Sequence, residues 1–166
     1  MDLIDKHGRT VRDLRISVTD RCNFRCTYCM PEEGLKWLDK AEVLSFEEIE
    51  RVSRILVERF GINSLRLTGG EPTVRAHLPR LIAQLAALRL EDGSKPNIAL
   101  TTNGATLRNI AGELRAAGLD RINVSLDSLR ADRFLAMTRR DELDNVLAGI
   151  AEASKAGFDI VKVNTV

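Results

Sequence analysis

The chain has 166 residues, 44% of them hydrophobic, which predicts one globular domain with a core of its own. Its formal net charge of +1 provides no global field that would attract nucleic acid or an anionic membrane. No apolar run is long enough to cross a bilayer, and the polar start MDLIDKHGRT is unlike a signal peptide, so we expect a cytoplasmic protein.

All three cysteines lie in the segment TDRCNFRCTYCMP, at Cys22, Cys26 and Cys29. Disulfides are a poor explanation, because three is an odd number and pairing residues this close would strain the loop. Two interpretations remain: a zinc site, whose fourth ligand would be His7 or His77, and an iron–sulfur cluster with one iron free of protein ligands. The spacing C-x3-C-x2-C favours the cluster, which would also need a reducing compartment.

The segment after the cysteines predicts a helix that starts near Phe46. Ser45 is a suitable N-cap, and Glu48 completes a capping box with it. Gly61 is placed to end the helix in a left-handed conformation. At helical spacing, one face carries the apolar residues Ile49, Val52, Leu56 and Phe60.

The rest of the chain repeats the alternation of strand and helix. We expect strands within residues 62–70, 97–104, 121–128 and 159–166, and helices near residues 78–88, 107–117 and 145–156. Three helix ends share a glycine followed by an apolar residue, at 61–62, 118–119 and 157–158. This alternation predicts a parallel α/β sheet that is either doubly wound or part of a barrel.

Polar segments at the strand ends favour the barrel. TGGEP, TTNG and SLDS each follow apolar strand residues, at the carboxyl ends where barrel enzymes build their sites. We therefore predict a partial (βα) barrel of the TIM type, with about five parallel strands and outer helices. Alternation turns Arg66 away from its neighbouring leucines and Lys162 away from its neighbouring valines. An inward cation needs an anionic partner.

Several motifs together resemble a known family. The cysteine segment and LRLTGGEP are similar to the cysteine loop and GGEP motif of the radical S-adenosylmethionine (SAM) enzymes. The segments RDLRISVTDRCNFRCTYCMP, LTTNG, INVSLDSL and VKVNTV resemble, in order and spacing, the GTP 3′,8-cyclase family of molybdenum cofactor biosynthesis. The resemblance covers essentially the whole chain. It implies a lyase in which a 5′-deoxyadenosyl radical removes the 3′ hydrogen of GTP and the ribose closes onto guanine C8.

The resemblance also implies roles for individual residues. Cys22, Cys26 and Cys29 would hold a 4Fe–4S cluster, and SAM would contact Tyr28, Gly70 and Ser125. GTP would contact Arg15, Arg66, Thr101 and Lys162. Several of these residues also have a structural interpretation: Gly70 could serve only a tight turn with Gly69, and Ser125 could serve only as a cap. No separate protein acid or base is implied.

In the resembled family a second cysteine trio, further along the chain, holds another 4Fe–4S cluster. This sequence has no cysteines for it, and a complete barrel needs about 250 residues. We therefore interpret residues 1–166 as a radical SAM core domain truncated before the barrel closes, and we expect it to be inactive in cyclisation by itself. The implied partners are an electron donor and the enzyme of the next molybdopterin step. Two other functions stay open: a different radical SAM enzyme, such as a peptide modifier, and a non-catalytic iron–sulfur or nucleotide-binding module.

Overall fold

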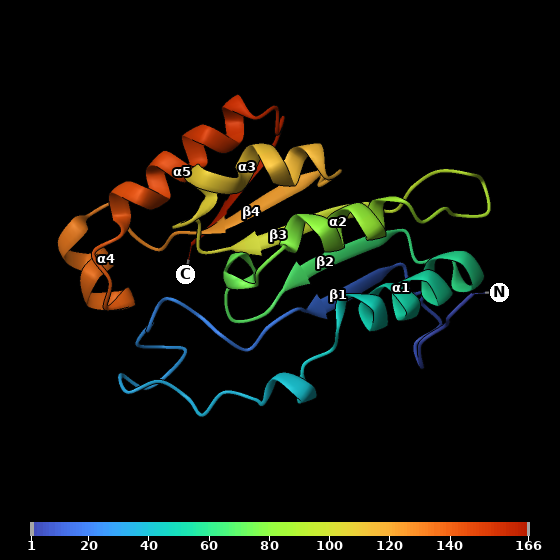
Figure 1. Cartoon of the computed structure of the whole chain (residues 1–166), viewed down its shortest axis with the longest axis horizontal. Helices are drawn as coiled ribbons and strands as arrows, with labels where there is room; N and C mark the ends of the chain where they lie inside the picture. The colour runs from blue at the N-terminus through green and yellow to red at the C-terminus, as the bar shows by residue number, and fades with distance from the viewer. Residues whose placement is uncertain (1, 166) are drawn as a thin grey trace.

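The computed structural model describes residues 2–165, and within them it contains one parallel sheet of five strands (Figure 1). The strands are β1 (Asp13–Ser17), β2 (Ser64–Thr68), β3 (Asn97–Thr102), β4 (Arg121–Ser125) and β5 (Val161–Asn164). They lie side by side in chain order, each parallel to the next. This order is the winding of a βα barrel, because a doubly wound sheet reverses its strand order partway. The predicted partial barrel is confirmed.

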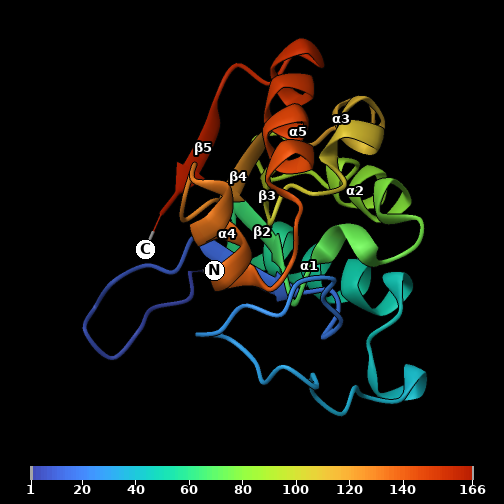
Figure 2. The ribbon, with the colours of Figure 1, turned by 90° about the vertical axis from the view of Figure 1, so that its left-hand side faces the viewer.

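The helices lie on one face of this sheet and at one end of it. They are α1 (Phe46–Phe60), α2 (Leu78–Ala86), α3 (Leu107–Ala116), α4 (Ala131–Thr138) and α5 (Leu143–Lys155), with short 3-10 turns η1 (Lys40–Glu42) and η2 (Pro72–Val74). Figure 2 shows α1, α2, α3 and α5 on the same side of the strands, while α4 lies beyond the carboxyl ends. Within residues 2–165, none of the helices has the length and apolar composition needed to cross a membrane.

Strand alternation separates an apolar face from a polar one. In β2, Leu65 and Leu67 are fully buried beneath the helices, whereas Arg66 between them is exposed. In register with them, Ile98, Leu100, Ile122 and Val124 continue the buried face across β3 and β4. This layer packs against the helices and forms the core. Each Å² of apolar surface removed from water there stabilises the fold by about 25 cal/mol.

Helix α1 begins and ends where the sequence predicts. The Glu48 N–H donates to the Ser45 hydroxyl at 3.1 Å, and the Ser45 N–H donates to the Glu48 carboxylate at 2.7 Å, which forms the capping box. Gly61 ends the helix with φ +67. One part of the predicted apolar face is wrong: Val52 is 49% exposed, and the buried stripe runs instead through Ile49, Ser53 and Val57.

The glycine–apolar repeat at the helix ends serves one structural purpose. At each of the three positions the apolar residue is almost fully buried and its N–H donates back into the last turn of the helix. Ile62, for example, donates to the Leu56 carbonyl at 3.1 Å, after Gly61 has reversed the chain. A left-handed residue at this place satisfies the last carbonyl groups of the helix, and glycine adopts it without steric strain.

Helix α4 was not predicted. It has eight residues, its N-cap Arg130 makes no side-chain capping bond, and its buried residues are Phe134 and Thr138 alone among those described. It ends at Arg139, whose φ is +54, where glycine is the usual residue. A short amphipathic segment without capping residues gives too little periodicity to mark a helix.

Candidate functional site

The segment that carries the cysteines crosses the carboxyl end of the sheet as a loop without regular secondary structure. We call residues 18–31 the cysteine loop. It is joined to the TGGEP segment after β2 by backbone hydrogen bonds: the Gly70 N–H donates to the Thr19 carbonyl and the Glu71 N–H to the Arg21 carbonyl, both at 2.8 Å. The two motifs recognised in the sequence therefore form one local structure.

Gly69 and Gly70 let the cysteine loop approach the end of β2 directly. A Cβ atom on Gly70 would lie 2.4 Å from the Arg21 carbonyl oxygen and 2.5 Å from that of Asp20. A Cβ atom on Gly69, whose φ is +148, would lie 2.3 Å from the Thr19 oxygen. The close approach that the sequence suggests for a ligand is made here by the protein's own backbone.

Glu71, in the same motif, is buried and fully engaged. One carboxylate oxygen accepts from the Thr73 N–H at 3.0 Å, from the Thr73 hydroxyl at 2.5 Å and from the Thr102 hydroxyl at 2.6 Å. The other accepts from the Asn103 N–H at 2.6 Å. Its exposed fraction is 1%. The carboxylate thus ties the end of β2 to the TTNG segment after β3, and hydrogen bonds to a charged group are the stronger kind.

Two further contacts bring the other strand ends to the cysteine loop. The Asn103 side-chain amide donates to the Asn23 side chain at 2.8 Å. The Tyr28 hydroxyl donates to Asp127, in the SLDS segment after β4, at 2.6 Å. Partial burial, followed by this hydrogen bond, raises the pKa of Tyr28 far above its usual range. The loop is therefore held by the ends of β2, β3 and β4 at once.

The three thiols lie at the surface of this assembly. Cys22 and Cys26 are half-buried and Cys29 is exposed, and none forms a disulfide. Burial raises the pKa of the Cys22 and Cys26 thiols, and the neighbouring cysteines raise that of Cys22 further. The Phe24 N–H donates to the Cys22 sulfur at 3.4 Å, a bond of the kind that stabilises a thiolate.

The donor set of the cysteine loop can be compared with the two metal interpretations. Within residues 2–165, no three His, Cys, Asp or Glu side chains are grouped closely enough to hold one metal ion. Three thiols from one short loop are the ligand type of a 4Fe–4S cluster, in which each thiolate would bind a different iron. The donor set fits that group.

The four predicted GTP contacts lie on the face of the sheet that the helices do not cover. Arg15 on β1 is directly in register with Arg66 on β2, and Thr101 on β3 is in register with Lys162 on β5 through Asn123. Arg66 forms an exposed ion pair with Asp13 at 3.4 Å. Within the part of the chain that the structure describes, the side chains of Arg15 and Lys162 have no hydrogen-bond or ion-pair partner.

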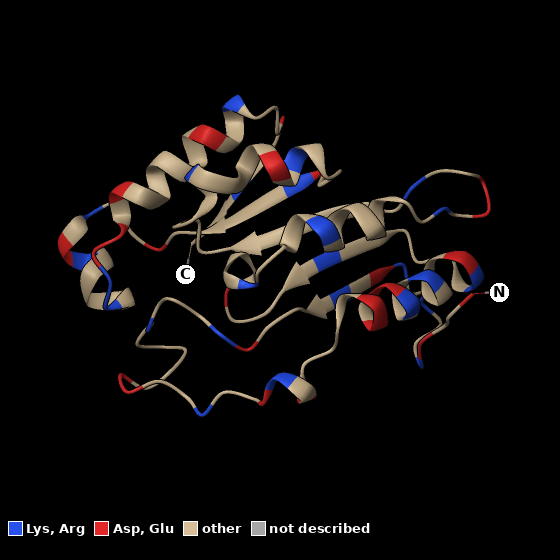
Figure 3. Ribbon diagram, viewed as in Figure 1, with Lys and Arg blue, Asp and Glu red and all other residues tan. Residues whose placement is uncertain are grey.

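The predicted SAM contacts lie at the carboxyl ends of the strands. Ser125 is the last residue of β4, Gly70 follows β2, and Tyr28 lies in the cysteine loop. Figure 3 shows basic residues on the strands themselves and along the cysteine loop. The sequence prediction missed Glu71 and Asp127. Glu71 could have been found as the one acid of the TGGEP segment that the sequence analysis singled out, but nothing near Asp127 in the sequence indicates its partner.

Comparisons with known proteins show the family of the chain. The sequence model of the Radical SAM superfamily matches residues 16–166, and the chain belongs to that superfamily. Within it, the chain is 54% identical over 165 residues to a GTP 3′,8-cyclase of Corynebacterium glutamicum, which covers 99% of this chain and 44% of the relative. It is also 54% identical over 164 residues to a GTP 3′,8-cyclase of Streptomyces coelicolor, which covers 99% of this chain and 47% of the relative. The chain spans about half the length of the curated relatives it matches.

Solved structures share the fold at low sequence identity. HydG, a maturase of the [FeFe]-hydrogenase, matches 95% of this chain and 36% of its own with a TM-score of 0.73 at 20% identity. Streptococcus suis SuiB bound to S-adenosylmethionine matches 96% of this chain and 34% of its own, with a TM-score of 0.74 at 17% identity. These likenesses establish the partial barrel and no more than the fold.

Proposed function

We propose that this chain carries the radical SAM part of a GTP 3′,8-cyclase of molybdenum cofactor biosynthesis. The observation that carries the proposal is the 54% identity along 99% of the chain to proteins of that name. The arrangement of the cysteine loop and the open basic face supports it. Because the chain spans about half the length of those relatives, the complete reaction, its substrate and its partners belong to the proposal.

Cys22, Cys26 and Cys29 would hold a 4Fe–4S cluster in this proposal, leaving one iron for SAM. When bound and reduced by one electron, the cluster would cleave SAM and supply the 5′-deoxyadenosyl radical that the family uses to remove the 3′ hydrogen of GTP, so that the ribose closes onto guanine C8. The residues around them orient the partners and exclude water. Tyr28, Gly70 and Ser125 would line the SAM site at the carboxyl ends of the strands, and we assign no separate protein acid or base.

The GTP site would lie on the open face of the sheet, beside the carboxyl ends. Arg15, Arg66 and Lys162 supply three cations there, and Thr101 supplies a hydroxyl. Guanidinium groups bind phosphate oxygens in pairs, and an ammonium binds them as a point charge. For Arg66 the phosphate would replace the weak, exposed ion pair with Asp13.

The proposal also includes parts beyond this site. The three cysteines of the chain would be taken by one cluster, so a second cluster of the kind implied by the family would need ligands from outside these 166 residues. An electron donor would reduce the first cluster, and the enzyme of the next molybdopterin step would receive the product. We place the protein in the cytoplasm, where thiolates stay reduced.

Anaerobic reconstitution with iron and sulfide tests the proposal in two stages. We expect about one 4Fe–4S cluster per chain, lost in Cys26→Ala, and SAM cleavage on reduction. Titration with GTP should then show binding that Arg66→Gln and Lys162→Gln weaken, while Arg51→Gln on the exposed side of α1 leaves it unchanged. Stoichiometric zinc without iron would reject the cluster. SAM cleavage with no preference for GTP over ATP or a peptide would point to another radical SAM enzyme.

A further inference from the structure

The end of helix α4 is hydrogen-bonded to the cysteine loop, although no motif in the sequence indicates this contact. The Arg25 N–H donates to the Thr138 carbonyl at 3.0 Å, and the Thr27 N–H donates to the Met137 carbonyl at 2.8 Å. These two bonds pair the stretch before Cys26 and the residue after it with the last turn of α4. Cys26 is thereby bracketed by backbone contacts to a segment more than a hundred residues away.

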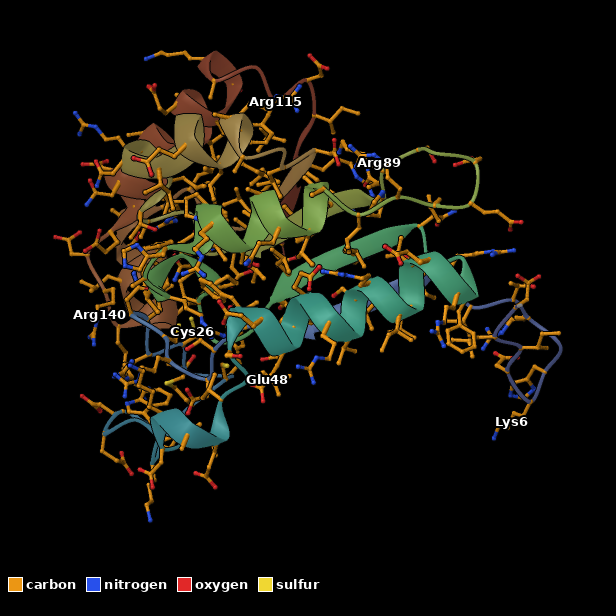
Figure 4. The ribbon with its side chains drawn as sticks, turned by 45° about the vertical axis from the view of Figure 1, so that its right-hand side comes forward. Lys6, Cys26, Glu48, Arg89, Arg115 and Arg140 are labelled. Atoms are coloured by element: carbon orange, nitrogen blue, oxygen red, sulfur yellow. The ribbon has the colours of Figure 1, made fainter. Side chains whose placement is uncertain are left out.

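Two arginines that follow this turn reach across the same loop. The Arg139 guanidinium donates to the Arg25 carbonyl at 3.2 Å and to the Met30 carbonyl at 3.5 Å. The Arg140 guanidinium donates to the Asn23 carbonyl at 3.0 Å. Figure 4 shows Arg140 beside the part of the loop that carries Cys26. Both side chains are partly buried, so these contacts are less screened than surface pairs.

A third arginine acts from within the loop. The Arg25 guanidinium donates to the Cys22 carbonyl at 2.8 Å and to the Phe24 carbonyl at 2.7 Å, and it lies over the Trp37 ring at 5.5 Å from the centroid. We call Arg25, Arg139 and Arg140 the arginine clamp. Together the three guanidinium groups bind five carbonyl groups of the cysteine loop.

The charge on the guanidinium groups matters for an anionic group in the loop. A carbonyl oxygen carries negative partial charge, and a hydrogen bond from a guanidinium offsets that charge. A 4Fe–4S cluster with three thiolate ligands is negative and gains another negative charge on reduction. Guanidinium groups hydrogen-bonded to the loop favour that charge, since net charge and hydrogen bonding set the potential of such clusters.

The backbone of Arg139 supports a role beyond simple packing. Its φ of +54 is in the left-handed region, where a non-glycine residue is uncommon and strained. Glycine would relieve that strain but would remove the contacts to the Arg25 and Met30 carbonyls. Arginine at this position therefore retains the two side-chain contacts, although its left-handed backbone conformation is strained.

We propose that the arginine clamp holds the cysteine loop in the shape that receives the cluster and favours the reduced cluster electrostatically. Arg139 and Arg140 are thus positioning residues, acting through the loop and not on a substrate. The inference rests on the proposed cluster at Cys22, Cys26 and Cys29. It is independent of GTP, because the clamp lies on the loop and not on the open face of the sheet.

The test compares Arg139→Gln and Arg140→Gln with Arg133→Gln, a change at an exposed arginine within helix α4 itself. In the metal-free protein, the amides of Cys29 and Met30 should exchange with solvent faster in the two clamp variants. After reconstitution, their clusters should be lost to a chelator about tenfold faster, the factor that corresponds to 1.4 kcal/mol. Arg133→Gln should match the unchanged protein in both measurements.

The reduction potential separates an electrostatic role from a structural one. Arg139→Gln should lower it by about 59 mV, which is a tenfold change in a one-electron equilibrium. Arg139→Lys, which keeps the charge, should recover most of that shift. If the unchanged protein binds no cluster, the proposed function fails. Suppose instead that the unchanged protein binds a cluster and that both Gln variants show the same amide exchange, the same rate of cluster loss and the same reduction potential as the unchanged protein. The proposed role of the arginine clamp is then refuted. Should Arg139→Gln not fold, Arg140→Gln and Arg139→Lys carry the same comparison.

Discussion

Replacing Gly70 with alanine should destabilise the fold itself, not only a ligand site. The new Cβ would lie 2.4 Å from the Arg21 carbonyl oxygen, whereas ordinary contact begins near 3.4 Å. The cysteine loop and the end of β2 would have to separate by about 1 Å, since neither atom belongs to a flexible side chain. That movement weakens the two hydrogen bonds from Gly70 to Thr19 and from Glu71 to Arg21.

The expected cost follows from these two contributions. Overpacking costs about 1 to 3 kcal/mol, and each weakened hydrogen bond adds about 0.5 to 1.5 kcal/mol. Gly70→Ala should therefore lower the free energy of unfolding by about 2 to 6 kcal/mol. Gly112→Ala is the matched control: no atom lies within 4 Å of its Cβ position in helix α3, so it should stabilise by about 0.5 to 1 kcal/mol.

Urea unfolding of the metal-free chain measures both variants. Each is compared with the unchanged protein at constant m-value, and SAM binding is then measured on reconstituted samples. If Gly70→Ala unfolds within about 0.5 kcal/mol of the unchanged protein and loses only SAM affinity, the glycine makes room for a ligand and our backbone argument is wrong.

Three further changes test other parts of the structure. Glu71→Gln should cost about 1 to 3 kcal/mol by urea unfolding, because an amide cannot accept all the donors that meet the buried carboxylate; an unchanged midpoint would contradict the network. Ser45→Ala should cost about 1 kcal/mol through loss of the α1 cap, and no loss would mean that the capping box is not formed in solution. Hydrogen bonds to Ser45 lower the pKa of Glu48, so its contribution to stability is present above its unfolded pKa and is lost as pH falls. The difference in free energy of unfolding between the unchanged protein and Glu48→Gln should accordingly shrink as the pH falls from 7 to 3. A constant difference would contradict the lowered pKa of Glu48.

The sequence predicted local structure well, because local structure depends on local signals. The capping box at Ser45, the left-handed Gly61 and the strand alternation around Arg66 are all encoded by residues a few positions apart. The predicted strand and helix positions agree with the structure to within a few residues. The burial of Val52 was predicted wrongly because helical spacing shows which residues share a face but not where the buried part of that face ends. Only the packing of the helix against the sheet determines that limit.

The connections between distant segments could not be predicted in the same way. Residues about a hundred positions apart are joined by the hydrogen bond from Tyr28 to Asp127 and by the backbone hydrogen bonds between α4 and the cysteine loop. No periodicity records such pairs. Similarly, the sequence shows that Gly70 needs space, but not whether a ligand or the chain itself fills it. The roles of the predicted SAM and GTP residues stay predictions.

The polar face of the sheet gathers several cations on a chain whose net charge is only +1. Arg15, Arg66, Arg121 and Lys162 lie on the strands of this face, and Asp13 is the acid that accompanies them there among the described residues. Strand alternation places these charges together while the apolar residues between them build the core.

Because the face is not covered by helices, each cation stays hydrated until a ligand displaces the water (Figure 2). A polyphosphate that neutralised several of them at once would bind in a salt-dependent manner, so GTP affinity should fall as ionic strength rises. Affinity that stayed constant with salt would place the nucleotide elsewhere.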